Sequence, residues 1–150
     1  MGQPVTHFEV HGKDAAALNA FYGELFGWHV DSNNPMNYGL VDTHGGERGI
    51  NGGIAQDDES WVTFYVEVDD LQAALDKAEK LGGTTVLPPS DVPGGPSLAL
   101  FTDPAGNRIG LANTESRLQQ LYGEAHSIEY GHSSDGGASV TISIPFSSQA

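Results

Sequence analysis

The chain has 150 residues and a formal net charge of −14, with twenty acidic residues against six basic ones. A surface of this sign repels phosphate backbones, so we expect no nucleic-acid partner. Cysteine is absent, which excludes disulfides and thiolate metal sites. Long apolar runs are also absent, so we expect no membrane partner. Because no secretory signal is visible, we expect a cytoplasmic location.

Residues 6–27 are predicted to form a strand followed by a helix. Phe8 and Val10 alternate with polar residues, which is typical of a strand with two different faces. Asp14 can cap a helix, because its carboxylate can accept from the free N–H groups of the first turn. Gly27 is expected to end that helix in a left-handed cap.

Three shorter strands are expected after this helix. They are predicted over 28–31, 37–42 and 49–56, with turn residues rich in asparagine, proline and glycine between them. The polar run at 57–60 is the best internal boundary of the chain.

Residues 61–83 repeat the same strand and helix. Val66 corresponds to Val10 and Asp70 to Asp14, a constant spacing of 56 positions. A repeat of this length is one supersecondary unit that cannot bury its apolar face alone. The remaining strands of the second unit are predicted over 84–87, 97–102 and 108–112, with a loop at 88–96.

The pattern predicts an α+β fold made of two tandem βαβββ units, 1–57 and 58–115, that form a curved, mostly antiparallel sheet. Strand parity assigns one set of residues to the helix-covered face: Phe8, Val10, Ile50, Ile54, Phe64, Val66, Leu98, Leu100, Ile109 and Leu111. The alternate residues are expected to line a cleft: His7, Glu9, Asn51, Gly53, Thr63, Tyr65, Glu67, Phe101, Arg108 and Gly110. A hollow lined by Phe8, Val66 and Ile109 would count against this assignment.

The paired units, with the segments FYGELFGW, VEVDDLQAAL and DPAGNRIGL, resemble the vicinal oxygen chelate superfamily. That superfamily includes glyoxalase I, bleomycin-resistance proteins and extradiol dioxygenases. The resemblance covers residues 4 to about 115. It implies the fold predicted above and, in the enzymes, a divalent metal bound by residues on the first and last strands of each unit.

The resemblance places His7, Gly53, Thr63 and Gly110 at the four metal-ligand positions, so one ligand of four is retained. A single imidazole does not hold a divalent metal, which needs about three protein ligands. We therefore expect no metal and no other cofactor. The two glycines are expected to enlarge the cleft for a bulky organic ligand.

Seven cleft-facing residues are candidates for ligand binding: His7, Glu9, Asn51, Thr63, Tyr65, Phe101 and Arg108. No catalytic residue can be assigned. His7 has two open interpretations, a general base or polar contact in the cleft and a structurally inert histidine.

Arg108 and the aromatic candidates also have two interpretations each. Arg108 could bind an anionic ligand through its guanidinium, or it could pair with Glu9 or Glu67, which we favour. Tyr65 and Phe101 could form an aromatic wall for a flat ligand, or they could pack in the core.

Three classes of function remain. The first, which we favour, is a metal-independent protein that binds a small organic metabolite or antibiotic and forms a homodimer. The second is a glyoxalase-, epimerase- or dioxygenase-like enzyme, a lyase or dioxygenase of the superfamily, with a divalent metal at His7 and non-standard ligands. The third is a protein-interaction module whose cleft has lost its function.

Residues 116–150 lie outside the repeat and are predicted to form an extension that is not a complete domain. The pattern predicts a short helix at Leu118, Leu121 and Tyr122, then a hairpin of 127–130 and 138–146. This segment is similar to the C-terminal end of the ATPase domain of sensor histidine kinases. Its nucleotide-binding motifs are absent from the chain, so we expect no ATP site and a hairpin that extends a sheet edge or mediates a dimer contact.

Overall fold

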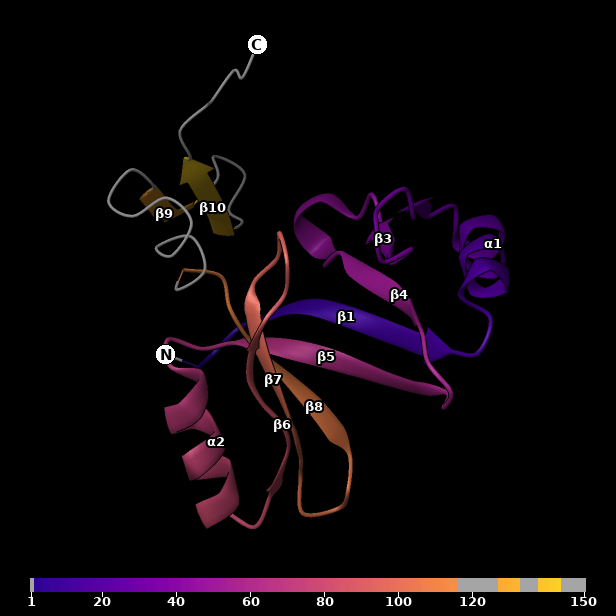
Figure 1. The fold of residues 1–150 in the computed structure, drawn as a ribbon. Coiled ribbons are helices and arrows are strands. Elements are labelled where there is room, and N and C mark those ends of the chain that lie inside the picture. Colours follow the sequence, from indigo (N-terminus) through magenta and orange to yellow (C-terminus); the bar gives the residue numbers. More distant parts are fainter. Residues whose placement is uncertain (1, 116–126, 133–137, 144–150) are drawn as a thin grey trace. The chain divides into compact units, whose positions relative to one another are not determined.

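The computed structural model describes residues 2–115, 127–132 and 138–143 (Figure 1). It forms two compact units. The first comprises Met1–Val66 with Arg108–Gly110, and the second comprises Glu67–Asn107 with Leu111–Ala150. Among the described residues, no helix has the length and apolar character needed to cross a bilayer.

The first unit carries one helix on five strands. Its elements are β1 (Val5–Gly12), α1 (Ala15–Phe26), β2 (His29–Asp31), β3 (Gly39–Asp42), a short 3-10 helix η1 (Gly46–Arg48), β4 (Gly52–Gln56) and β5 (Trp61–Glu67). The strands pair in the order β2-β3-β4-β1-β5. β1 runs parallel to β4, and the other pairs are antiparallel.

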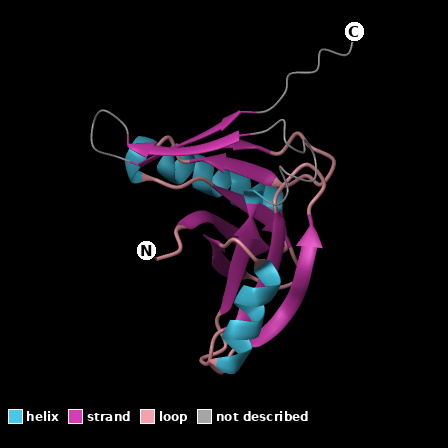
Figure 2. Cartoon of the chain, turned by 90° about the vertical axis from the view of Figure 1, so that its left-hand side faces the viewer, coloured by secondary structure: helices cyan, strands magenta, loops and turns pink. Residues whose placement is uncertain are grey.

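The second unit repeats the arrangement of one helix on several strands. Its elements are α2 (Leu71–Lys80), β6 (Thr84–Asp91), β7 (Ser97–Thr102), β8 (Arg108–Asn113), β9 (Ser127–His132) and β10 (Ala138–Ser143). The predicted tail hairpin is present: β9 pairs antiparallel with β10, and β9 continues to His132, beyond the predicted end at residue 130. The helix predicted before this hairpin lies outside the described residues. Figure 2 shows each helix against strands of its own unit. Strands β1 to β8 make a mostly antiparallel sheet, which confirms the α+β class.

Both helices begin at the aspartates that the repeat predicts. The Asp14 carboxylate accepts from the backbone N–H of Ala17, and the Asp70 carboxylate accepts from that of Ala73, each at 2.9 Å. Gly27 ends α1 with φ of 70°, a left-handed conformation that glycine adopts without steric cost. These contacts are local, which is why the sequence predicts them.

Strands β1 and β5 of the first unit pair antiparallel and lie side by side in Figure 1. Phe8 lies opposite Phe64, its own counterpart in the 56-residue repeat. A local two-fold axis therefore passes between these residues. Because this pairing joins β5 to β1, the compact units divide after Val66, and not at the boundary of the repeat.

The core of the first unit lies between α1 and the sheet. It comprises buried Ala15, Val41 and Ile54, with Phe8, Val10, Leu18, Tyr22, Trp28 and Val30 packed against them. Ile54 is completely buried. The prediction that Phe8, Val10 and Ile54 face the helix is confirmed.

On β5 the face that was predicted to be covered by a helix is largely exposed. Phe64 and Val62 are 40% and 67% exposed, whereas Thr63 and Tyr65, on the opposite side, are buried. Residues opposite each other in a pair share a face, so Phe64 does lie on the face of Phe8. At β5 that face is largely exposed to solvent. The side chains on the opposite face, which was predicted to bind the ligand, are the buried ones.

The largest departures from the predicted strand boundaries are in β6 and β4. β6 continues through Pro88 and Pro89 to Asp91, where a loop was predicted. Proline lacks a backbone donor and is tolerated there because β6 is an edge strand whose register shifts between Leu87 and Ser90. β4 begins only at Gly52.

Ile50 and Asn51 therefore precede β4 and belong to the loop that follows β3. Thr43 holds this loop: its backbone N–H donates to the Asn51 side-chain oxygen at 3.0 Å, and its hydroxyl donates to the carbonyl of Ile50 at 3.2 Å. The amide of Asn51 is engaged within the loop, so its predicted place on the cleft-facing side of a strand is wrong.

Candidate functional site

Glu9 is a buried carboxylate in the middle of β1, only 8% exposed. One of its oxygens accepts from the Tyr38 hydroxyl at 2.8 Å. The other accepts from the Tyr65 hydroxyl at 2.8 Å and lies 2.7 Å from Nε2 of His11. Hydrogen bonds of this number and length satisfy a buried charge. We call these four residues together with His7 the Glu9 network.

Strand geometry assembles most of this network. Successive side chains of a strand point to opposite faces, so His7, Glu9 and His11 lie on one side of β1. Tyr65 joins them because it lies opposite His7 in the β1–β5 pair. Tyr38 comes from the segment just before β3 and reaches Glu9 from there.

Tyr38 is fixed at both its backbone and its hydroxyl. The Asn34 amide donates to the Tyr38 carbonyl at 2.7 Å and accepts from its N–H at 3.1 Å. Because the single hydroxyl proton goes to Glu9, His7 Nε2, 2.8 Å away, must donate to the hydroxyl oxygen. The hydrogen-bond pattern thus assigns this tautomer and leaves Nδ1 of His7 as an acceptor.

The network sets the charge states of its members. Burial acts to raise the pKa of Glu9, but hydrogen bonds from His11 and the two tyrosines outweigh it and hold that pKa below its ordinary value of 4.5. Burial, with the Glu9 charge beside them, raises the pKa of Tyr38 and of Tyr65. Burial lowers the pKa of His7, and Glu9 only partly offsets this. At neutral pH the network therefore holds one carboxylate, two neutral phenols and a neutral His7.

Acid should weaken the fold partly through Glu9. Its folded pKa is depressed, so its contribution is complete above the unfolded value of about 4.5 and is lost as pH falls through the folded pKa. We expect the free energy of unfolding, measured with urea between pH 7 and pH 3, to fall more steeply below about pH 4.5 in the parent than in Glu9→Gln.

Glu67 provides a control of opposite sign. Burial raises its pKa, although the Thr114 backbone N–H and hydroxyl partly oppose this. A raised carboxyl pKa lowers stability as pH rises, so Glu67→Gln should remove a loss seen on going from acid to neutral pH. Parallel curves for the parent and Glu9→Gln would contradict the charge state assigned to Glu9.

Arg108 does not pair as predicted. Its guanidinium donates to Glu59 at 2.8 Å and lies 5.0 Å from the ring centroid of Trp61. The favoured pairing with Glu9 or Glu67 is therefore wrong, because residues just before β5 supply a nearer carboxylate. Arg108 is thus engaged in an exposed ion pair with Glu59 and forms no ion pair with Glu9 among the described residues.

Four residues of this region were not among the predicted ligand-binding candidates. They are His11, Tyr38, Asp57 and Trp61. His11 stacks on Trp61 with ring centroids 3.7 Å apart, and its Nδ1 lies 3.6 Å from the Asp57 carboxylate, which also accepts from the Trp61 indole. The alternation that selects Glu9 also points to His11. Tyr38 was expected inside a strand over 37–42, whereas the structure places it just before β3, which begins at Gly39.

Three other predicted candidates form no hydrogen bond with this network among the described residues, although Thr63 lies opposite Glu9 in the β1–β5 pair. The Thr63 hydroxyl donates to the backbone carbonyl of Arg108 at 2.9 Å. Asn51 holds the loop after β3, and Phe101 lies on β7 of the second unit, opposite Thr85. The structure thus brings His7, Glu9, Thr63 and Tyr65 of the predicted set together on β1 and β5.

Residues 5–111 match the family model of the Glyoxalase/Bleomycin resistance protein/Dioxygenase superfamily. The chain belongs to this superfamily. The match ends at residue 111, so the similarity of the tail to a sensor kinase ATPase domain stays a prediction.

Two curated relatives of this superfamily member are named for different activities. It is 33% identical over 110 residues to CFP32 of Mycobacterium tuberculosis, named as a glyoxylase, covering 65% of this chain and 41% of that protein. It is 27% identical over 117 residues to the anthracycline biosynthesis protein DnrV of Streptomyces peucetius, covering 66% and 42%. The chain thus spans about two fifths of the length of these curated relatives.

A solved structure shows the shared fold. The Mn(II)-bound glyoxalase from Novosphingobium aromaticivorans superposes with a TM-score of 0.57 at 18% identity, covering 75% of this chain and 39% of that one. Identity at this level shows the fold alone.

Tyrosines fill the space at two of the positions that the resemblance assigns to metal ligands. A Cβ atom on Gly53 would overlap the hydroxyl end of Tyr38, and one on Gly110 would overlap the ring of Tyr65. The prediction that these glycines enlarge a cleft is therefore wrong. They make room for two rings that belong to the chain itself.

The residues present do not fit the superfamily's divalent metal. His7 donates Nε2–H to Tyr38, Glu9 is engaged on both oxygens, and Thr63 binds a backbone carbonyl. Over the described ranges, no three or more His, Cys, Asp or Glu side chains are grouped so as to hold a metal ion. A metal would have to break the Glu9 network to gain ligands.

Proposed function

We propose that this superfamily member binds a small organic molecule without a metal, at the face of the first unit that carries His7. The observation that carries the proposal is that Tyr38 and Tyr65 occupy the space of two metal-ligand positions and donate to Glu9. The same carboxylate that could serve a metal is thereby committed to the protein's own hydroxyl groups.

His7 is the member of the network that can meet a ligand. Its side chain is 32% exposed, and its Nδ1 is an acceptor because Nε2 donates to Tyr38. A neutral imidazole held by a buried chain of hydrogen bonds is a fixed acceptor, which suits a hydroxyl or N–H donor of an organic ligand. The names of relatives in glyoxylase and anthracycline biosynthesis chemistry support a metabolite or antibiotic as the ligand class.

A thermal-shift screen tests the proposal. We expect hits from a metabolite and antibiotic library to raise the melting temperature of chelator-dialysed protein. A ligand at 100 times its Kd adds about 2.7 kcal/mol to the free energy of unfolding. His7→Ala should weaken binding of each hit by roughly tenfold, since the variant loses the hydrogen bond from the ligand to Nδ1 of His7 and such a bond contributes about 1.4 kcal/mol. His44→Ala is the matched control, because His44 is an exposed loop histidine.

Two outcomes would overturn the proposal. Hits that bind His7→Ala and the parent equally would remove His7 from the site. Binding that appears only after Mn²⁺ or Zn²⁺ is restored, with stoichiometric metal in the protein, would favour the metal-dependent enzyme instead. The structure contains a single chain, so the homodimer expected from the sequence stays a prediction.

A further inference from the structure

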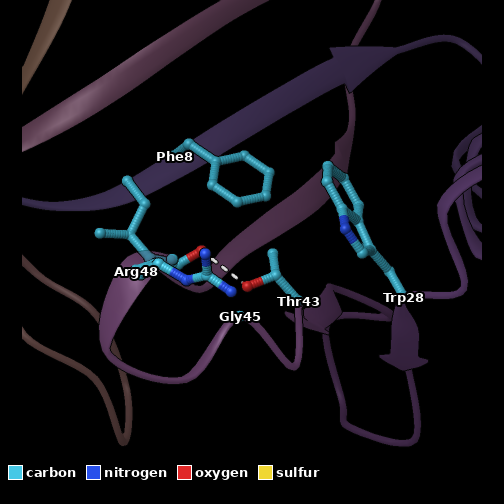
Figure 3. Close-up of a pocket in the computed structure, with 7 residues that line it drawn as sticks. Phe8, Trp28, Thr43, Gly45 and Arg48 are labelled. Carbon is cyan, nitrogen blue, oxygen red and sulfur yellow. Dashed lines mark hydrogen bonds between the residues drawn. The ribbon is translucent and has the colours of Figure 1, made fainter.

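A cavity of about 530 Å³ opens on the face of β1 opposite the Glu9 network (Figure 3). Phe8 of β1 lines it, and strand alternation turns Phe8 away from His7 and Glu9. Its volume lies in the range of small-molecule sites. A hollow lined by Phe8, Val66 and Ile109 would have counted against the predicted cleft face. Phe8 lines this cavity, but Val66 and Ile109 are not among its described lining residues.

Two aromatic rings form the apolar wall of the cavity. Phe8 and Trp28 have ring centroids 5.4 Å apart with planes inclined at 48°. Ile50, from the loop before β4, adds a partly exposed aliphatic side chain. Figure 3 shows both rings turned toward the space occupied by Arg48 and Thr43. A flat ring system is the ligand shape that such a wall accommodates.

The rim of the cavity is rich in hydrogen-bond donors. Arg48 lies there, exposed, and within the described part of the chain its guanidinium has no ion-pair partner. The indole N–H of Trp28 likewise has no acceptor among the described residues, and Figure 3 shows its nitrogen on the side that faces Thr43 and Arg48. The backbones of Gly45 and Gly49 complete the lining.

The charge of this lining is opposite to that of the chain. The whole sequence carries −14, yet the described lining residues include an arginine and no carboxylate. Arg108, by contrast, is neutralised by Glu59. A guanidinium fork binds a carboxylate through two parallel hydrogen bonds and is weakly hydrated, so it can do so beside apolar rings.

We propose that this cavity is a second binding site, for an aromatic carboxylate. The ring of the ligand lies against Phe8 and Trp28, and its carboxylate accepts from the Arg48 guanidinium and the Trp28 indole N–H. This site lies on the opposite face of β1 from His7, so it is independent of the function proposed above.

The two tryptophans of the chain allow a direct test by NMR. We would titrate ¹⁵N-labelled full-length protein with sodium 2-naphthoate and follow the two indole N–H signals. Trp28 should shift saturably with the probe. Trp61 should not, because its indole donates to Asp57 and its ring stacks on His11 of the Glu9 network. The neutral probe 2-naphthalenemethanol should bind at least about fivefold more weakly, since it lacks the charge.

Variants separate this site from other apolar surfaces. Arg48→Gln should raise the Kd for 2-naphthoate by about tenfold or more and change that for 2-naphthalenemethanol by less than about twofold. Arg108→Gln, the matched arginine control, and His7→Ala should leave the Kd for 2-naphthoate unchanged. The proposal is overturned if the Trp28 signal stays still, if both indole signals move together, or if Arg48→Gln binds 2-naphthoate like the parent.

Discussion

Replacing Gly52 by alanine should destabilise the first unit by about 3 kcal/mol, because overpacking against backbone cannot be relieved by a side-chain rotation. A Cβ atom on Gly52 would lie 2.5 Å from the carbonyl oxygen of Phe8 and 2.6 Å from its ring. Gly52 is opposite Phe8 in the parallel β1–β4 pair, so the added methyl group pushes these two strands apart. Urea unfolding, followed by the far-ultraviolet circular dichroism signal, measures the loss.

Gly23→Ala is the matched control for Gly52→Ala. Gly23 lies inside α1, and a Cβ there would meet its nearest neighbour, the carbonyl oxygen of Trp28, at 3.4 Å. Alanine in a helix interior is favoured over glycine by roughly 0.5–1 kcal/mol, so this variant should be slightly more stable than the parent. A Gly52→Ala protein as stable as the parent would contradict the close approach of β1 and β4.

Glu9→Gln should lower the free energy of unfolding by about 2–4 kcal/mol at neutral pH, the cost of breaking a buried charged hydrogen-bond network. The carboxylate accepts from Tyr38, Tyr65 and His11. A glutamine amide offers one accepting oxygen and turns an N–H₂ donor toward groups that are themselves donors. At least one buried donor then loses its partner.

Glu59→Gln is the control for Glu9→Gln. Glu59 also forms a charged hydrogen bond, with Arg108, but its side chain is 69% exposed. Exposed pairs contribute roughly 0–1 kcal/mol, so this variant should stay close to the parent. Tyr65→Phe should fall between the two, since it removes one donor and leaves Glu9 with others. If Glu9→Gln costs no more than Glu59→Gln, the network does not stabilise the fold.

The elements of the fold were largely predictable from the sequence. Asp14 and Asp70 cap the two helices as the 56-residue repeat predicts. That the equivalent strands of the two halves pair with Phe8 opposite Phe64 is a finding of the structure. The errors fell where neighbours in space overrule the local pattern. Two prolines were taken to end β6, yet an edge strand tolerates them.

The candidate site was only partly predictable. Strand alternation selects His7, Glu9 and Tyr65, and the structure places them together. It does not reveal Tyr38, whose ring fills the space beside Gly53. The cavity at Arg48 was missed too, because strand alternation says nothing about the loop residues that line it, and Gly49 and Ile50 were taken for part of β4.

The sequence by itself determined the superfamily, the two βαβββ repeats and the helix caps, and the resemblance places glycine or threonine at three of the four positions it assigns to metal ligands. These features depend on residue types a few positions apart, or on a constant spacing along the chain. Only the tertiary structure decided that tyrosines occupy the vacated positions, and that an unpaired guanidinium of the described chain lies beside two aromatic rings. Those arrangements depend on which side chains fill the space between strands, and strand register alone does not specify that packing.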